Sequence, residues 1–157
     1  MSKIYFAGDH AFFELKNVLT DYVRTLGHDV EDLGALTLDP EDDYPDMVSV
    51  CAKRVAGETG SFGVIGGGSG QGEAMVANRE KGIRSAVFYG KGQLMQSISV
   101  QDDGYSIVRL SREHNDANVL SLGARFISID EAKEAVRIFV ATQFSGDSRH
   151  TRRISKF

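Results

Sequence analysis

The sequence lacks most of the features that place a protein outside the ordinary globular class. It has one cysteine, Cys51, so an internal disulfide framework is excluded and a reducing compartment, the cytoplasm, is expected. No apolar run approaches the roughly 20 residues that cross a bilayer, so no membrane partner is expected. The net charge of −4 gives a nucleic-acid partner no electrostatic support. The length of 157 residues suits one compact domain with its own core.

Two kinds of apolar pattern alternate along the chain. Short stretches rich in β-branched and aromatic residues predict strands at residues 3–8, 28–34, 62–67, 83–89 and 118–126. Apolar residues at helical spacing predict helices at residues 12–26, 45–55, 73–78 and 128–144. This alternation predicts a single α/β domain over residues 1–157, with a five-stranded parallel sheet covered on both faces. Ligands of such sheets bind beyond the carboxyl ends of the strands, where we therefore look for functional residues.

The most unusual stretch is the loop after the third predicted strand. Residues 64–79 read VIGGGSGQGEAMVANR and hold five glycines between positions 66 and 72. A dinucleotide-binding loop needs G-x-G-x-x-G, and a P-loop needs Lys and Ser or Thr after the glycines; this loop has neither. An anion-binding nest of backbone N–H groups fits better, because glycine lets these groups approach a ligand. The alternative is a tight turn between strand and helix, which requires fewer glycines.

Glu73 stands where the helix after this loop begins. A helix dipole stabilises an acidic residue in its first turn by roughly 0.3–1 kcal/mol, so an ordinary helix-start glutamate is one interpretation. The other interpretation is catalytic, because proton abstraction next to a carbonyl requires a base beside an oxyanion site. In that case Glu73 takes the proton from carbon, and the backbone amides hold the negative oxygen of the enediolate that forms.

Five further residues combine suitable chemistry with a suitable place. Asp9 and His10 directly follow the first strand, although a capping aspartate and a surface histidine are the plain alternatives. His114 precedes the fifth strand, and a lone histidine is more often structural than catalytic. Arg149 and Arg153 are four residues apart, so on a helical turn they share a face and could clamp one phosphate. The alternative for the arginines is a solvated basic tail.

Five segments resemble, in the same order, one enzyme family. They are GDH at residues 8–10, DYP at 43–45, GGSGQGEAMVANR at 67–79, REHNDANVLSLGAR at 112–125 and RHTRR at 149–153. The family comprises the type B ribose-5-phosphate isomerases and the related galactose-6-phosphate isomerase subunits. The resemblance spans nearly the whole chain and implies a Rossmann-like three-layer α/β/α sandwich that binds no dinucleotide. It also implies homodimers, or dimers of dimers, with active sites shared between subunits.

The resemblance further implies a reaction, the interconversion of an aldose phosphate and a ketose phosphate through an enediolate, with no metal or other cofactor. Many members place a catalytic cysteine just after the third strand, where this chain has Gly67. Cys51 lies elsewhere and cannot replace it. A mycobacterial-like branch uses a glutamate inside the glycine loop instead, and Glu73 matches that position. By this resemblance Glu73 is the catalytic base.

The other site residues correspond to the family position by position. His114 is similar to the acid that opens the furanose ring. The residues that resemble substrate ligands are Asp9, His10, Ser69, Gly70, Gln71, Gly72, Asn115, Arg125, Arg149 and Arg153. Among these, the three arginines correspond to phosphate ligands. His150 lies between two of them and resembles a supporting residue.

One segment departs from the family pattern. Residues 88–115 form a longer connection than the single short helix usual there. We expect the extra residues, at about 90–111, to form a flap or an added dimer contact. Because His114 ends this segment, the substrate stays open between ribose 5-phosphate and a hexose 6-phosphate, such as allose or galactose 6-phosphate. A non-catalytic sugar-phosphate-binding subunit is the third possibility, and the joint presence of Glu73, His114 and the arginines argues against it.

Overall fold

The sheet is formed as the sequence predicts. The computed structural model describes residues 1–96 and 100–157. Within them, parallel strands form one 5-stranded sheet in the order β2-β1-β3-β5-β4. The strands are β1 (Lys3–Gly8), β2 (Asp29–Asp32), β3 (Phe62–Gly67), β4 (Ser85–Phe88) and β5 (Val119–Gly123). The predicted five-stranded parallel sheet is therefore confirmed.

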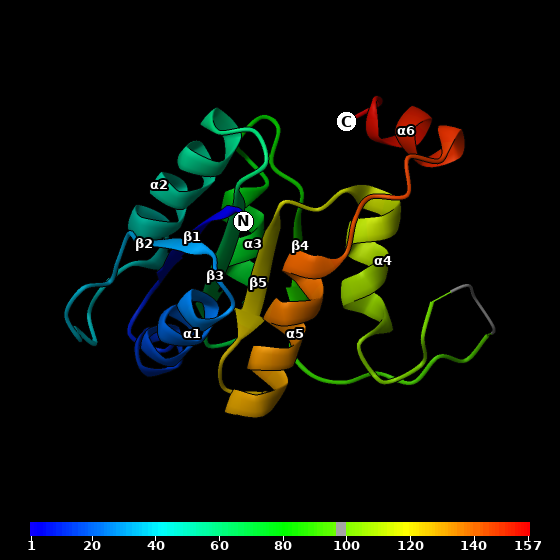
Figure 1. Cartoon of the computed structure of the whole chain (residues 1–157). Coiled ribbons are helices and arrows are strands. Elements are labelled where there is room, and N and C mark those ends of the chain that lie inside the picture. Colours follow the sequence, from blue (N-terminus) through cyan, green and yellow to red (C-terminus); the bar gives the residue numbers. More distant parts are fainter. Residues whose placement is uncertain (97–99) are drawn as a thin grey trace.

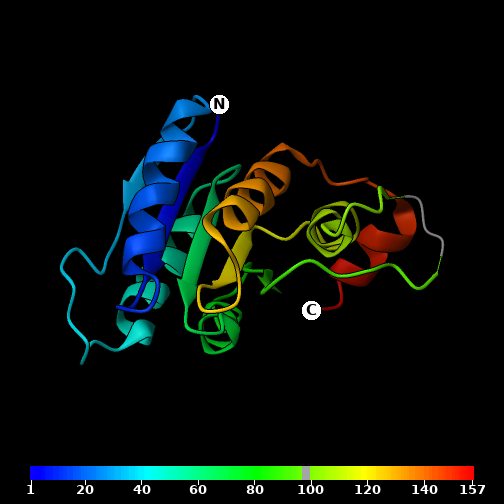
Figure 2. The same ribbon diagram turned by 90° about the horizontal axis from the view of Figure 1, so that it is seen from below.

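Helices cover both faces of this sheet, which gives the three-layer α/β/α sandwich (Figures 1 and 2). One face carries α1 (Phe13–Thr25), α4 (Ser106–Asn115) and α5 (Ile129–Ala141), and the other carries α2 (Tyr44–Gly57) and α3 (Gln71–Ala77). A last helix, α6 (Ser148–Ile154), packs against α4 outside the layers (Figure 1). Among the described residues, no helix combines the length and the apolar character needed to cross a bilayer.

Two cores hold the layers together. Phe6, Phe12 and Phe139 are fully buried between the sheet and the helices α1 and α5. On the other face, Cys51 of α2 and Ile65 of β3 belong to a second cluster of buried residues. Cys51 is 0% exposed, and burial raises the pKa of its thiol to about 12. The cysteine is thus a protonated core residue, as its neighbours in the sequence predict.

Two of the predicted strands are too long at their carboxyl ends. After β2 the chain turns, because the Asp32 carboxylate accepts a hydrogen bond from the Gly34 N–H at 3.0 Å. After β5 a turn forms in which the Phe126 N–H donates to the Gly123 carbonyl at 3.0 Å. The Arg125 N–H donates to the Gly68 carbonyl at 3.2 Å, so this second turn lies directly beside the glycine loop.

The long segment before β5 contains α4, a helix that the residue pattern did not predict. It has few apolar residues, and its buried side chains include the polar Ser106, Ser111 and Arg112. The loop ahead of α4 is closed at its base by a hydrogen bond from the Gly92 N–H to the Gly104 carbonyl at 3.1 Å. The flap or dimer contact expected at residues 90–111 includes residues 97–99, which lie outside the described residues.

Helix α5 ends at Ala141, three residues before the predicted end at 144, because Thr142 has an extended backbone and the chain leaves there for α6.

The sheet reverses its winding between β1 and β3. From β1 the chain crosses to β2 on one side, and from β3 it continues to the strands on the other side. The last paired residues of these two neighbours are Gly8 and Gly66, and Gly67 pairs with Gly123 of β5. Such a switch point leaves a crevice outside the carboxyl ends of the strands, where α/β sheets bind ligands.

Candidate active site

A cavity of about 470 Å³ lies at this switch point, beyond the carboxyl ends of β1, β3 and β5. Its lining residues are Asp9, Tyr44, Gly68, Ser69, Gly72, Glu73, Arg125 and Phe126. The fold therefore brings together five residues that the sequence analysis selected from separate segments: Asp9, Ser69, Gly72, Glu73 and Arg125. Gly70 and Gln71 belong to the same glycine loop.

Glu73 lies in the first turn of α3 and is 4% exposed. The preceding Gly70 has a left-handed φ of 76°, which only glycine adopts at no cost, and this turns the chain into the helix. Buried Ser121 of β5 donates a hydrogen bond to the Gly70 carbonyl and holds the loop in place. Burial raises the pKa of the Glu73 carboxyl, and the charge of Asp9 raises it further. A carboxylate tuned in this way is a stronger base near neutral pH.

His10 is paired with Asp42, a residue to which the sequence analysis gave no role. Oδ1 of Asp42 accepts hydrogen bonds from the His10 backbone N–H at 3.0 Å and from ring Nδ1 at 2.8 Å. A carboxylate only accepts, so Nδ1 carries the proton and Nε2 is left for a ligand. This hydrogen bond raises the pKa of the His10 imidazole, and the nearby Asp9 charge adds to the effect. The only signal in the sequence is the acidic loop ahead of Tyr44.

Two aromatic residues of the cavity were also missed. The hydroxyl of Tyr44, at the start of α2, packs over Gly72 so closely that a β-carbon there would lie 2.5 Å from it. Phe126 is 64% exposed at the rim, where it meets the ring of Tyr89 edge to face at 6.4 Å between centroids. Tyr44 belongs to the quoted DYP segment, whereas nothing in the sequence marks Phe126.

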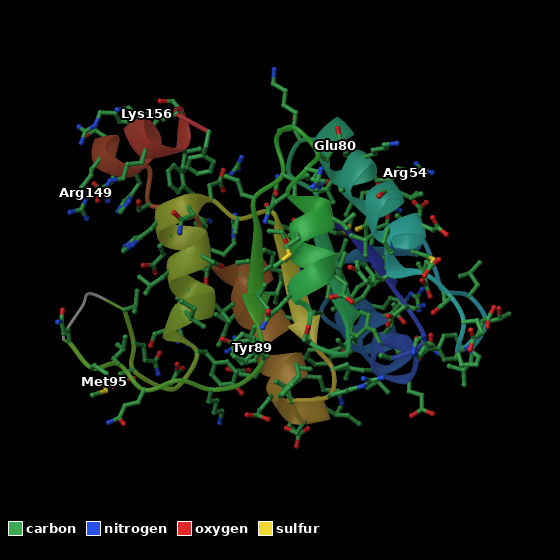
Figure 3. The ribbon with its side chains drawn as sticks, turned by 180° about the vertical axis from the view of Figure 1, so that it is seen from behind. Arg54, Glu80, Tyr89, Met95, Arg149 and Lys156 are labelled. Atoms are coloured by element: carbon green, nitrogen blue, oxygen red, sulfur yellow. The ribbon has the colours of Figure 1, made fainter. Side chains whose placement is uncertain are left out.

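A second group of predicted site residues lies on the side of the sheet where the strands begin, opposite the carboxyl ends that form the Glu73 cavity. His114 and Asn115 end α4, which leads into the amino end of β5. Arg149 and Arg153 lie on α6, which confirms that they belong to one helix. Figures 1 and 3 show α6 and Arg149 at the edge away from Tyr89, which follows the carboxyl end of β4. One copy of the chain therefore does not join this group to the Glu73 cavity.

The second group is ordered around a pair of histidines. The rings of His114 and His150 stack with 4.1 Å between centroids and 14° between planes. His150 is 3% exposed, and burial together with the neighbouring His114 lowers the pKa of its imidazole. A neutral His150 can lie against His114 without charge repulsion. Asn115 also lines a larger hollow of about 590 Å³, between the end of α3 and the end of α4.

Arg125 is placed differently from the other two predicted phosphate ligands. It lines the Glu73 cavity, and Arg149 and Arg153 lie on α6 at the far edge. The three arginines thus do not form one cluster within a single chain.

Comparison with known proteins relates the whole chain to one family. The family described as Ribose/Galactose Isomerase matches residues 4–157. Ribose-5-phosphate isomerase B of Mycobacterium tuberculosis is 38% identical over 152 residues, which are 97% of this chain and 85% of that protein. Its counterpart in Escherichia coli is 34% identical over 154 residues, 98% of this chain and 93% of that protein.

Solved structures agree with the sequence matches. The ribose-5-phosphate isomerase B of Mycoplasma genitalium, with bound ribulose 5-phosphate, superposes with a TM-score of 0.86 at 32% identity, covering 98% of this chain and 92% of that one. The type B enzyme of Trypanosoma brucei also gives 0.86, at 30% identity, covering 99% and 96%. The chain belongs to the ribose/galactose isomerase family.

Proposed function

We propose that this protein is a type B ribose-5-phosphate isomerase of the glutamate-base, mycobacterial-like branch. It interconverts ribose 5-phosphate and ribulose 5-phosphate in the cytoplasm and uses no metal or other cofactor. The observation that carries the proposal is the buried Glu73 carboxyl, with its raised pKa, beside the glycine loop and Asp9. Support comes from relatives that carry this activity in their names and that the chain matches over 85% and 93% of their length.

The reaction begins with the ring form of the aldose. His114 takes the proton of the anomeric hydroxyl, on C1, and returns one to the ring oxygen, which opens the furanose. Glu73 then removes the proton from C2, and the electron pair moves to the carbonyl oxygen to give an enediolate. The backbone N–H groups and hydroxyl of the Ser69–Gly72 loop hold the enediolate oxygens. The proton on O2 of the enediolate then moves to O1, and Glu73 returns its proton to C1, so that the base is regenerated and the ketose is formed.

The remaining residues bind and orient the substrate. Asp9 accepts hydrogen bonds from sugar hydroxyls, and His10, held by Asp42, presents Nε2 to the sugar. Arg149 and Arg153 of one copy bind the phosphate together with Arg125, which lines the Glu73 cavity of the other copy. Asn115 contributes a further contact beside His114.

The complete site requires two copies of the chain. Because Glu73 and His114 lie at opposite edges of the fold, the His114 edge of one copy has to meet the Glu73 cavity of another. A two-fold axis makes two equal sites in this way, so the minimal active unit is a homodimer, and a dimer of dimers is compatible with the same contact.

The alternative substrate is a hexose 6-phosphate, because the chemistry is the same and only the length of the bound chain differs. Parallel assays on ribose 5-phosphate, allose 6-phosphate and galactose 6-phosphate decide between them. We expect the highest kcat/KM with ribose 5-phosphate. Higher values with either hexose phosphate would reassign the substrate, and no turnover of any of the three would favour a non-catalytic sugar-phosphate-binding subunit.

A further inference from the structure

The carboxylate of Asp116 lies between two arginines at the end of α4. Its Oδ2 accepts a hydrogen bond from Nη2 of Arg84 at 2.9 Å, and its Oδ1 accepts one from Nη1 of Arg112 at 2.9 Å. Asp116 itself has a left-handed φ of 44°, which is uncommon for a residue other than glycine. Such a backbone conformation persists where the surroundings hold it, and the two arginines provide that restraint.

The same arginines also bind the backbone on both sides of Asp116. Nε of Arg84 donates to the carbonyls of Asn115 and Asp116, both at 2.9 Å. Arg112 donates to the carbonyl of Ala117, at the entry to β5. The end of α4 is thus fixed through its main chain, immediately beside the proposed site residue Asn115.

Arg112 extends this network to the chain that carries α6. It is 6% exposed, and its guanidinium lies over the rings of Phe62 and Phe139 at 4.8 Å and 5.6 Å from their centroids. From this position Nε donates to the carbonyl of Thr142 at 3.1 Å, just after α5. Farther along, the Ser145 N–H donates to the Glu113 carbonyl at 3.1 Å. The end of α4 and the segment that leads to α6 are therefore tied together.

His114 lies inside this arrangement. It is two residues from both Arg112 and Asp116, and its ring stacks on His150 of α6 at 4.1 Å between centroids. The direction of the His114 ring depends on the end of α4 and on the place of α6, and the network holds both. A misplacement of about 1 Å in a reacting group can cost on the order of 10²-fold in rate.

We propose that Asp116, with Arg84 and Arg112, is a positioning unit that sets His114 for ring opening and sets α6 for phosphate binding. The inference rests on the proposed role of His114. A purely stabilising ion pair is the alternative, and a paired buried charge is by itself weak support for stability. The two explanations differ in what they predict for the separate steps of the reaction.

The test variant is Asp116→Asn, which keeps the side-chain shape and the tolerance for a left-handed backbone but removes the charge. We expect kcat/KM with cyclic ribose 5-phosphate to fall about tenfold or more. Exchange of the C1 proton of ribulose 5-phosphate with solvent, measured by NMR in heavy water at saturating substrate, should stay within about twofold, because this ketose is open-chain and its exchange needs Glu73 but not ring opening. Arg84→Lys, which loses both carbonyl contacts of Nε, should give the same split.

The chain offers a matched control at the other end of the same helix. Asp103 binds Arg109 of α4 through two hydrogen bonds, of which one is 2.7 Å. Asp103→Asn removes a comparable carboxylate–arginine pair far from His114, and we expect it to leave both reactions unchanged. Melting temperatures of all variants establish that each assay is run on folded protein.

Three outcomes would overturn the inference. Full activity of folded Asp116→Asn on cyclic substrate would do so, provided that His114→Asn is impaired in the same assay. Equal losses in turnover and in exchange would reduce the network to general structural support. A loss in Asp103→Asn equal to that in Asp116→Asn would do the same. If His114→Asn itself is fully active, it is the proposed role of His114 that fails.

Discussion

Gly67 and Glu73 compete for one space: a β-carbon on Gly67 would overlap Oε1 of the Glu73 carboxylate. Gly67 ends β3 and Glu73 lies in the first turn of α3, so the glycine loop folds back and brings the two positions together. A side chain at the end of β3 and a carboxylate base on α3 therefore exclude each other in this geometry. The overlap gives a physical reason for glycine at position 67, where the resemblance implies a cysteine, under the proposal that Glu73 is the base.

Gly67→Ala should inactivate the enzyme without unfolding it. The φ of Gly67 lies outside the left-handed region, so the backbone accepts alanine, and only the Glu73 carboxylate has to move. We expect kcat to fall by about 10²-fold, because the base is displaced from its working position. Steady-state kinetics and a thermal melt measure the two effects. A Gly67→Ala enzyme of normal activity would mean that Glu73 works from another rotamer or is not the base.

Glu73→Gln separates the basicity of this residue from its shape. Removal of a general base should lower kcat by roughly 10²–10⁴-fold while substrate still binds. Deuterium from heavy water should enter the carbon next to the carbonyl with the wild-type protein and not with the variant. Cys51→Ala is the control, since its buried thiol has a pKa raised to about 12 and should contribute nothing to the reaction. A folded but inactive Cys51→Ala protein would contradict this assignment.

Asp42→Asn should lower the pKa of His10. The hydrogen bond from the imidazolium to Asp42 holds that pKa above its usual value, so loss of the charge on Asp42 brings it down. Two-dimensional NMR of the imidazole signals against pH measures the shift directly. Because the folded-state pKa is raised, the pair stabilises the fold at pH values below the ordinary histidine pKa, and this contribution is lost as pH rises through the folded-state pKa.

The destabilisation caused by Asp42→Asn should therefore be larger at pH 5 than at pH 9, which thermal melts can compare. Asp43→Asn, one residue along the same loop, is the control, and it should leave the His10 titration unchanged. An unchanged His10 pKa in Asp42→Asn would show that the pair does not persist in solution.

The sequence predicted the layers of the fold because they depend on local patterns. Period-2 and period-3.6 apolar spacing mark strands and helices, and the glycine loop marks the switch point. Helix α4 was missed because polar side chains, among them Ser111 and Arg112, take buried positions where a search for apolar residues finds no signal. Its burial depends on distant partners such as Phe139 and Thr142, which local sequence does not reveal.

The same limit applies to the candidate site. Glu73 was selected because its place after a glycine loop is a local feature. Asp42 was not, because its contact with His10 forms only when the loop before α2 folds over the end of β1. The division of the predicted site between two edges of the sheet likewise follows from topology, since α4 enters the amino end of β5 while Glu73 follows the carboxyl end of β3.

That division gives the sharpest prediction for the assembly. Glu73→Gln and His114→Asn should each be nearly inactive alone. When the two variant proteins are mixed, dissociated and reassembled, half of the dimers become mixed. In a mixed dimer, one site receives both altered residues and the other receives native Glu73 from one copy and native His114 from the other. Activity should then recover to about a quarter of the wild-type value at the same total concentration, because about half of the dimers each regain one of two sites.

A different result follows if each chain carries a complete site of its own. No site in a mixed dimer would then hold both native residues, so mixing would restore nothing. The control is a mixture of Glu73→Gln with the double variant Glu73→Gln/His114→Asn, which has no native Glu73 and should stay inactive in either arrangement. Recovery in the first mixture and not in the control would establish that Glu73 and His114 act from different copies. Size measurements and tagged subunits show whether mixed dimers form. If they form and stay inactive, the shared site is removed from the mechanism.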